Sequence, residues 1–363
     1  MVFVAYIVLA FTIVQLLVAL ANLLLESGLP ECEINSNEKV SVLIPARNQE
    51  DNISTLLDDL LKQDYPNIEI IVFNDQSEDN TAGIVAEYIT RDKRVQLINS
   101  CGLPKGWQRR NFACHSLSGF ARGRYFLFVT PDLRIGNDII SRAVSYSRKY
   151  NLDLLSVIPK QIMKKFGEKI TVPNINYIIV SLLPLVLVRK LKIPLLAAAD
   201  GQFMLFTAKK YKWATPHEKL KNSKVEDVLI PHIYKKFGLH TACLLGDDSM
   251  TCRRYKGFRD TIPGISRNII AFFGNSYILA WLFWIITTLG FLPAFSQLPA
   301  LLAAFYFILY LTTRIVVSIA GRQSIRDNLL YIFPMQFSLF IFISREFINE
   351  IYRKFEWKGR NLD

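Results

Sequence analysis

The chain has 363 residues, of which 51% are hydrophobic and 20% are charged, and it carries a formal net charge of +12. This length accommodates one catalytic domain together with membrane segments, because domains usually run to about 100–200 residues. The charged fraction argues against a wholly buried transporter and indicates apolar segments joined to a soluble domain. The positive charge favours anionic phospholipid at a membrane surface over nucleic acid, since no RNA- or DNA-binding motif accompanies it.

The cysteines and histidines argue against a structural metal site or a disulfide framework. Five cysteines are an odd number, and they include no C-x-x-C pair. The four histidines show no spacing typical of metal ligands. We therefore expect reduced thiols facing the cytosol. The cysteines are Cys32, Cys101, Cys114, Cys243 and Cys252.

The first apolar run, Val2 to Leu25, is long enough to span a bilayer core as a helix. A secretory signal peptide is the alternative. No basic residues precede the run, and it is longer than the apolar region of a signal peptide. We predict that residues 1–26 are an uncleaved transmembrane anchor, followed by a polar linker up to Glu38.

From Lys39 to about Arg134, short apolar runs alternate with helical patterns. This alternation is typical of βαβ units around a mainly parallel sheet whose two faces are covered by helices. Such sheets bind ligands at the carboxyl ends of their strands. The expected strands and helices are 40–44, 52–62, 68–73, 81–88, 95–98, 111–121 and 125–129.

The apolar stretch Ile170–Ala199 is interrupted by three prolines and by three basic residues near its end. These interruptions make it a poor span, so we predict an amphipathic segment lying in the membrane interface. A buried internal helix is the alternative reading.

Three further apolar segments follow, at Ile269–Leu292, Leu298–Ala320 and Leu329–Ile343. The first two are long enough to cross a bilayer. If all three crossed, the basic tail 349–363 would lie opposite the catalytic domain, against the positive-inside tendency. We predict that within 268–348 two segments cross, that the third is re-entrant or interfacial, and that the tail is cytosolic.

Polar clusters follow the first two expected strands. The first contains Pro45, Arg47, Asn48 and Glu50, and the second runs from Asn74 to Thr81 with acids at 75 and 79. Arginine, amide and carboxylate groups at two strand ends suit a base, a ribose and phosphates. A solvated turn would have the same composition when taken alone.

Together the two clusters resemble the opening of family 2 glycosyltransferases of the GT-A fold. In that family the first strand ends in a Pro-Ala-Arg-Asn-Glu type turn and the second in a Val-Asp-Asp-Gly-Ser-x-Asp-x-Thr type turn. The resemblance implies that Asp75 and Asp79 contact the nucleotide. This chain differs by Asn74 in place of the first acid and by Gln76 in place of the glycine.

The next two elements continue the resemblance on the donor side. Gly106-Trp107 precedes Arg109-Arg110, where lipid- and carotenoid-modifying members have Gly-Lys, and a guanidinium at Arg110 is suited to a diphosphate. Thr130-Pro131-Asp132 stands where the family has Asp-x-Asp. The resemblance implies that Asp132 holds Mg²⁺ or Mn²⁺ against the sugar-nucleotide phosphates, with one carboxylate lost at Thr130.

The remaining elements lie on the acceptor side and near the chain end. Asp200, Gly201 and Gln202 resemble the start of a Gly-Gln-Phe-Met-Leu strand beside the acceptor. Glu226-Asp227 resembles the family's Glu-Asp motif, which implies that Asp227 is the catalytic base, although either acid could instead cap a helix. Arg253-Arg254-Tyr255 and Trp357-Lys358-Gly359-Arg360 resemble two further elements, and the two arginines would assist at the diphosphate.

The resemblance implies a GT-A domain of α/β fold, with a Rossmann-like mixed sheet at 39–267, between N- and C-terminal transmembrane helices. Its activity would be inverting transfer of a hexosyl unit from a nucleotide-diphospho-sugar to a membrane lipid or carotenoid-like acceptor. The catalytic domain would face the cytosol at a bacterial-type cell membrane, and nucleic acid would not be a partner. The alternatives are a non-catalytic membrane scaffold and a polysaccharide synthase. A synthase would normally carry a Gln-x-x-Arg-Trp motif, which this chain lacks.

Overall fold

The computed structural model describes residues 1–25, 28–31, 36–352, 356–357 and 360–361. They form two compact units. One unit comprises Met1–Ser27, Gln161–Val186 and Arg254–Asp363, and the other comprises Gly28–Lys160 and Leu187–Arg253. Cys32, Lys358, Gly359 and the tail cations Arg353 and Lys354 lie outside the described residues.

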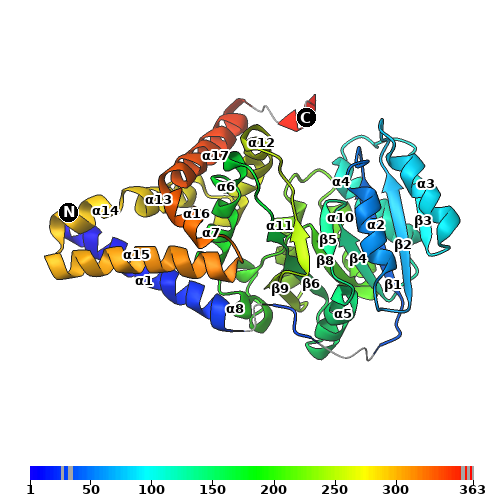
Figure 1. Ribbon diagram of the computed structural model, residues 1–363, viewed down its shortest axis with the longest axis horizontal. Coiled ribbons are helices and arrows are strands. Elements are labelled where there is room, and N and C mark those ends of the chain that lie inside the picture. Colours follow the sequence, from blue (N-terminus) through cyan, green and yellow to red (C-terminus); the bar gives the residue numbers. More distant parts are fainter. Residues whose placement is uncertain (26–27, 32–35, 353–355, 358–359, 362–363) are drawn as a thin grey trace. The chain divides into compact units, whose positions relative to one another are not determined.

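A seven-stranded mixed sheet forms the centre of the second unit, in the order β3-β2-β1-β4-β8-β6-β9 (Figure 1). Strands β3, β2, β1 and β4 are parallel to one another, whereas β8 runs antiparallel to both of its neighbours. This confirms the predicted α/β fold and mainly parallel sheet. The strands are β1 Val40–Ala46, β2 Ile68–Asn74, β3 Val95–Asn99, β4 Tyr125–Val129, β6 Leu154–Ile158, β8 Phe203–Thr207 and β9 Thr241–Leu245.

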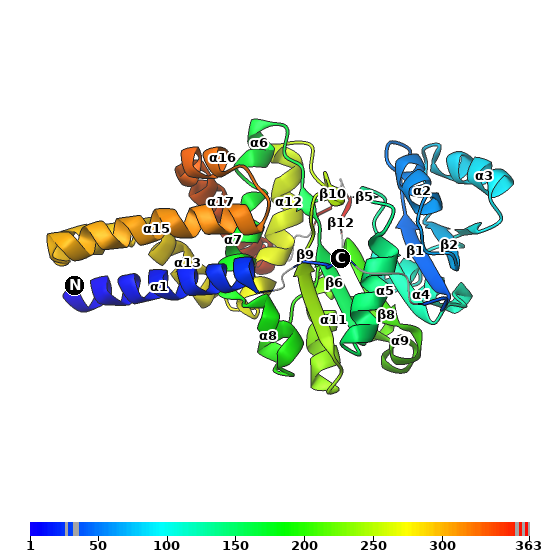
Figure 2. The same cartoon turned by 60° about the horizontal axis from the view of Figure 1, so that its bottom comes forward.

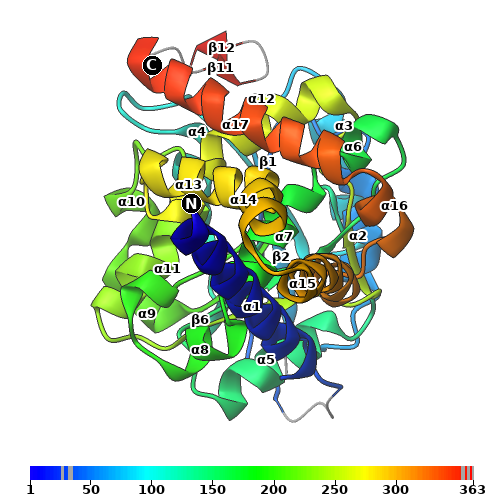
Figure 3. The ribbon, with the colours of Figure 1, turned by 90° about the vertical axis from the view of Figure 1, so that its left-hand side faces the viewer.

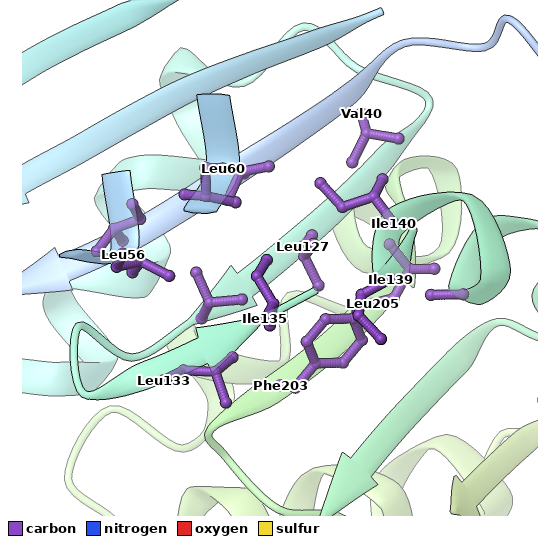
Figure 4. Close-up of a cluster of buried hydrophobic side chains, with 14 of the residues drawn as sticks. Val40, Leu56, Leu60, Leu127, Leu133, Ile135, Ile139, Ile140, Phe203 and Leu205 are labelled. Atoms are coloured by element: carbon purple, nitrogen blue, oxygen red, sulfur yellow. The ribbon is translucent and has the colours of Figure 1, made fainter. Parts of the chain in front are cut away.

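Helices cover both faces of this sheet, which explains why its strands read as mostly apolar runs. Alternate residues of a strand point to opposite faces, so Val42 and Leu43 of β1 belong to two different buried clusters. Figure 4 shows the first cluster, in which Leu56 and Leu60 lie near Leu127. The helices are α2 Ile53–Leu61, α3 Thr81–Arg91, α4 Arg109–Phe120, α5 Ile139–Lys149, α9 Ala208–Ala214, α10 Pro216–Lys219 and α11 Glu226–Lys236.

A small second sheet has the order β5-β10-β7. Its strands are β5 Leu133–Ile135, β10 Met250–Cys252 and β7 Lys160–Gln161. Strand β5 follows β4 after a short turn, so this turn and the strand-end loops of the large sheet belong to the same unit.

The other unit is built from helices. Helix α1 lies along α15 and also packs against α7, while α17 packs against α12 and α13 (Figures 2 and 3). The helices of this unit are α1 Val2–Leu24, α6 Phe166–Lys169, α7 Pro173–Leu182, α12 Phe258–Ile269, α13 Tyr277–Leu289, α14 Phe291–Gln297, α15 Ala300–Ala320, α16 Ile325–Leu330 and α17 Ile332–Tyr352. Its short strands are β11 Glu356–Trp357 and β12 Arg360–Asn361.

Within the described residues, α1 and α15 are each long and apolar enough to cross a membrane. The segment predicted at Ile269–Leu292 is broken, because α13 begins only at Tyr277 and lies at 100° to the helical stretch Phe258–Phe273. This stretch and α13 count as a third candidate span only if the two are taken together across the bend. Helix α17 is not among the candidates, so the crossing of the last segment and the side of the tail stay predictions.

The stretch Ile170–Ala199 divides into a buried part and an exposed part. Helix α7 is largely buried within its unit, where the amide of Asn22 donates to the carbonyls of Val180 and Leu183, each at 2.8 Å. This burial matches the alternative of an internal helix. The exposed apolar side chains of the stretch follow α8 (Leu185–Lys190), at Leu191, Ile193 and Leu195, and their contact with a membrane stays a prediction.

Candidate active site

The ends of β1 and β2 bring the two predicted polar clusters together. The strands run in parallel register to their last pair, Ala46 opposite Asn74. Beyond it, the Asp75 amide donates to the Ala46 carbonyl at 2.9 Å, and the Arg47 guanidinium donates to the Asp75 carbonyl at 2.7 Å. Arg47 therefore fixes the turn after β2, and Pro45 is the next-to-last residue of β1.

Glu50 and Asp79 join the loops after these two strands. The Glu50 amide donates to the Asp79 carboxylate at 3.0 Å, and the Asn80 amide donates to the Glu50 carboxylate at 3.0 Å. Asn48 adds a matching bond, because its side-chain oxygen accepts from the Glu78 amide at 2.9 Å. Desolvation raises the pKa of Asp79, but the hydrogen bonds from Thr81 and from the Glu50 amide together lower it by more. The pKa of Asp79 therefore lies below its usual value. Asn48, Glu50 and Asp79 thus act on loop geometry.

The two departures at 74 and 76 both have structural explanations. The Asn74 side chain donates to the Asn99 side chain at 2.9 Å and accepts from the Ser77 amide at 3.1 Å. The Asn74 side chain therefore joins the ends of β2 and β3 and stabilises the turn after β2. Gln76 has φ of 53°, in the left-handed region that favours glycine.

Asp75 is buried and is paired with Arg109, the first residue of α4. The distance between Arg109 Nη1 and Asp75 Oδ2 is 3.1 Å. The other oxygen, Oδ1, is buried without a hydrogen-bond partner among the described residues. A buried acceptor without a donor costs about 1–3 kcal/mol, so a ligand that donates to Oδ1 would recover that energy.

Arg110 connects the next three elements of the site. Its guanidinium donates to the Gly201 carbonyl and lies 3.3 Å from Glu226 Oε1. A Cβ at position 201 would overlap this guanidinium, so glycine is needed for the close approach. Helix α4, the segment before β8 and the start of α11 therefore meet at Arg110.

The acid pair Glu226 and Asp227 lies buried in the first turn of α11. Asp227 Oδ1 accepts from the Val228 amide at 3.0 Å, whereas Glu226 faces Arg110. Among the described residues Asp227 forms no salt bridge, whereas the Glu226 carboxylate is paired with Arg110.

Asp200 and Gln202 shape the segment that leads into β8. The Gln202 amide donates to the Asp200 carboxylate at 2.7 Å, and the Asp200 amide donates to the Ser156 hydroxyl at 2.8 Å. The Thr130 amide in turn donates to the Gln202 carbonyl at 3.2 Å. This last bond connects the end of β4, where Asp132 follows, to the predicted acceptor side.

Comparisons with known proteins agree with this arrangement. Residues 41–212 match the family described as Glycosyl transferase family 2. A 4,4'-diaponeurosporenoate glycosyltransferase of Staphylococcus haemolyticus (strain JCSC1435) is 28% identical over 141 residues, which is 38% of this chain and 36% of that protein. The poly(ribitol-phosphate) beta-N-acetylglucosaminyltransferase TarS of Staphylococcus aureus (strain Mu50) is 30% identical over 149 residues, 38% of this chain and 25% of that protein.

The chain carries a family 2 glycosyltransferase domain. Its fold is also that of a solved mannosyltransferase from Pyrobaculum calidifontis, PcManGT, at a TM-score of 0.60 and 14% identity over 97% of this chain and 99% of that one. The GT-A fold predicted from the sequence is therefore confirmed. The matched region spans about a third or less of each of the two curated relatives.

The end of β4 in the glycosyltransferase domain carries a sparse set of oxygen ligands. Asp132 is half-buried, and the Thr130 hydroxyl is buried without a partner among the described residues. No group of three or more His, Cys, Asp or Glu in the described part of the chain is placed to hold a metal ion. A cation here would need ligands from substrate and water, as Mg²⁺ commonly takes at phosphate sites.

Two residues of the glycosyltransferase domain that support the site were not predicted. Asn111 is buried and donates to the carbonyls of Leu220 at 2.6 Å and Ser223 at 2.9 Å, which fixes the loop before α11. His217 is buried beside Tyr211, with 2.7 Å between Tyr211 Oη and His217 Nδ1. Burial, with smaller contributions from Arg110 and His115, lowers the pKa of His217 to about 3. Asn111 was the first residue of a predicted helix, whereas nothing in the sequence marked His217.

The predicted arginine pair at the end of the domain is divided by the unit boundary. Arg253 follows β10 and ends one unit, while Arg254 and Tyr255 belong to the other. Trp357 and Arg360 lie in β11 and β12 of that other unit. The roles of Arg253 and Arg254 at a diphosphate stay predictions.

Proposed function

We propose that this protein transfers a hexosyl unit from a nucleoside diphosphate sugar to a hydroxyl or carboxyl group of a membrane lipid or carotenoid-like acceptor, with inversion at the anomeric carbon. The observation that carries the proposal is the convergence on Arg110 of α4, the Gly201 segment and the Glu226-Asp227 turn, inside a family 2 domain. A carotenoid acid glycosyltransferase among the relatives supports the class of acceptor.

The donor would bind at the ends of β1 and β2. Asp75 Oδ1 offers a buried acceptor to an N–H or O–H group of the nucleotide, and Arg109 holds the other oxygen in place. PcManGT, which shares the fold, was solved with GDP-Man and Mn²⁺, and this supports a nucleotide sugar as the donor.

Transfer would begin with attack of the acceptor oxygen on the anomeric carbon. The bond between that carbon and the diphosphate oxygen breaks, its electron pair leaves with the nucleoside diphosphate, and the acceptor proton moves to the Asp227 carboxylate. Arg110 would offset the charge that develops on the leaving diphosphate while its contact with Glu226 keeps it aimed. Glu226 is the alternative base.

A divalent cation, Mg²⁺ or Mn²⁺, fits the residues at the end of β4 in one mode only. Asp132 would supply a carboxylate and Thr130 a hydroxyl oxygen, with the donor's phosphates and water completing the ligands. When bound, the cation would neutralise part of the diphosphate charge. Because Thr130 stands in place of an acid, Arg110 would carry a larger share of that neutralisation.

The acceptor class also depends on a membrane location. Helices α1 and α15 are the candidates to anchor the protein. The exposed Leu191, Ile193 and Leu195, flanked by Lys190 and Lys192, would rest in the interface with the glycosyltransferase domain in the cytosol.

A non-catalytic scaffold is the second candidate, and one observation favours it. Asn74 stands where the family has an acid, and both atoms of its amide are used within the fold. Such a protein would retain the folded glycosyltransferase domain but would not catalyse sugar transfer.

Detergent-purified protein incubated with a panel of UDP, GDP and TDP sugars separates the two candidates. We expect one donor to be hydrolysed slowly or bound, with release of its nucleoside diphosphate. Neither binding nor release with any donor would overturn the proposed activity and leave the scaffold.

A further inference from the structure

An apolar groove of about 840 Å³ lies in the helical unit, and all of its lining residues belong to that unit. Its volume falls in the usual range for sites of small molecules, roughly 300–1,000 Å³. The walls come from α6, the start of α12 and the start of α17. Four of the lining residues are phenylalanines, at 166, 258, 333 and 337.

The walls of the groove are fixed by close packing. A Cβ on Gly167 would collide with the backbone nitrogen of Phe258, so α6 and α12 approach as closely as a glycine allows. On the opposite side, the Phe166 ring packs edge-on against Tyr331 with 5.2 Å between centroids. Phe333 and Phe337 nevertheless remain 75% and 64% exposed. The groove is therefore a formed apolar surface that lacks a cover from this chain's described residues.

Three cations stand beside the groove, and the exposed acid that follows them, Asp260, accepts from the Lys256 amide at 3.1 Å. Lys165 lines it, Lys164 precedes that residue, and Arg259 follows Phe258. All three are exposed and pair with no carboxylate among the described residues. The nearby acids are already engaged, since Asp327 pairs with Lys169 at 2.8 Å and Glu168 is buried and accepts from the Lys164 amide at 2.7 Å.

We propose that this groove binds an anionic phospholipid, with one acyl chain against the phenylalanines and the phosphate on Lys164 and Lys165. Burial of a hydrocarbon chain suits an apolar wall, and each basic residue at a membrane surface adds attraction for an anionic headgroup. The unit that contains the groove also contains both candidate spans, which places phospholipid within its reach. The assignment does not depend on the glycosyl transfer proposed above.

The test uses full-length protein in dodecyl maltoside and a phosphatidylglycerol that carries a photoreactive diazirine at the end of one acyl chain. After irradiation, mass spectrometry of the digested protein locates the adducts. We expect them on the peptides that contain Phe258 and Phe333 to Phe337. Unlabelled phosphatidylglycerol should compete roughly tenfold better than phosphatidylcholine of the same chain length.

Two sets of variants separate the headgroup from the chain. Lys164→Gln with Lys165→Gln should raise the half-saturating lipid concentration about tenfold, because two basic residues at the headgroup are lost. Lys209→Gln with Lys210→Gln, the same charge change on α9, should leave it unaltered. Phe333→Gln with Phe337→Gln should abolish the groove adducts, with thermal unfolding measured to confirm that the variant folds.

Three outcomes would overturn the proposal. Adducts spread over the helical unit with none enriched at the groove would show that the lipid binds elsewhere. Equal competition by phosphatidylcholine would remove the role of the lysines. Cross-links between two copies through Phe333 or Phe337 would assign the groove to a protein interface instead.

Discussion

The guanidinium of Arg110 lies directly against the backbone of Gly201 and donates to its carbonyl oxygen. Gly201→Ala places a methyl group where that guanidinium lies, so Arg110 must move away from Glu226 as well. We expect kcat to fall by about 10- to 100-fold, because a misplaced charge near the leaving group weakens transition-state stabilisation. Steady-state kinetics would measure this. Gly119→Ala, on the same helix as Arg110 and with open space around its Cβ, is the control.

The metal requirement should depend on the nucleotide. Asp132 with the Thr130 hydroxyl is a weak site alone, so calorimetry should show clear Mn²⁺ binding only with a nucleoside diphosphate present. Thr130→Asp should strengthen Mn²⁺ affinity, and Asp132→Ala should abolish transfer. Full activity in chelator, with Asp132→Ala unimpaired, would rule out metal assistance.

His217 should make the glycosyltransferase domain sensitive to acid. Its folded pKa of about 3 is below the usual 6.5, so the unfolded chain binds a proton first as pH falls. The stabilising contribution of neutral His217 is complete above pH 6.5 and is lost progressively between pH 6.5 and about 3, by up to about 1.4 kcal/mol per pH unit. Thermal unfolding of wild type and His217→Gln should therefore converge as pH falls through this window. Parallel pH profiles of the two proteins would contradict this.

The topology of the C-terminal end should be visible by labelling. If the tail is cytosolic, a cysteine placed at Asn361 reacts with an impermeant maleimide only after cells are permeabilised. Cys101→Ser removes the thiol that is exposed among the described residues, and Cys32→Ser removes the cysteine that lies outside them. Labelling in intact cells would show that a third segment crosses.

The strands were predictable because they are covered on both faces, so mostly apolar runs such as 68–73 lie within β2. The polar clusters after β1 and β2 followed from the rule that ligands bind at strand ends. The family resemblance supplied Arg110, Asp132 and the acid pair at 226 and 227, whose roles await measurement.

The remaining features depend on contacts between residues far apart in the chain. Arg109 and Asp75 are paired across 34 residues, and His217 packs against the aromatic rings of Phe128, Phe206 and Tyr211. The break before Tyr277 was missed because Gly274 and Asn275, both with positive φ, interrupt an otherwise apolar run. Apolar composition predicts whether a segment is long enough to span a membrane, but it does not predict where the helix in that segment bends.

The most direct measurement of the central claim follows labelled sugar into lipid. Membranes containing wild-type protein, supplied with the preferred radiolabelled nucleotide sugar, should transfer label to material extracted by organic solvent. Asp227→Asn should lower this rate by at least about 10²-fold while nucleotide-sugar binding persists, since loss of a general base affects chemistry and not donor affinity. Wild-type activity in Asp227→Asn, with loss in Glu226→Gln, would move the base to Glu226. Absence of lipid-bound label from wild-type membranes that bind the donor would contradict the account.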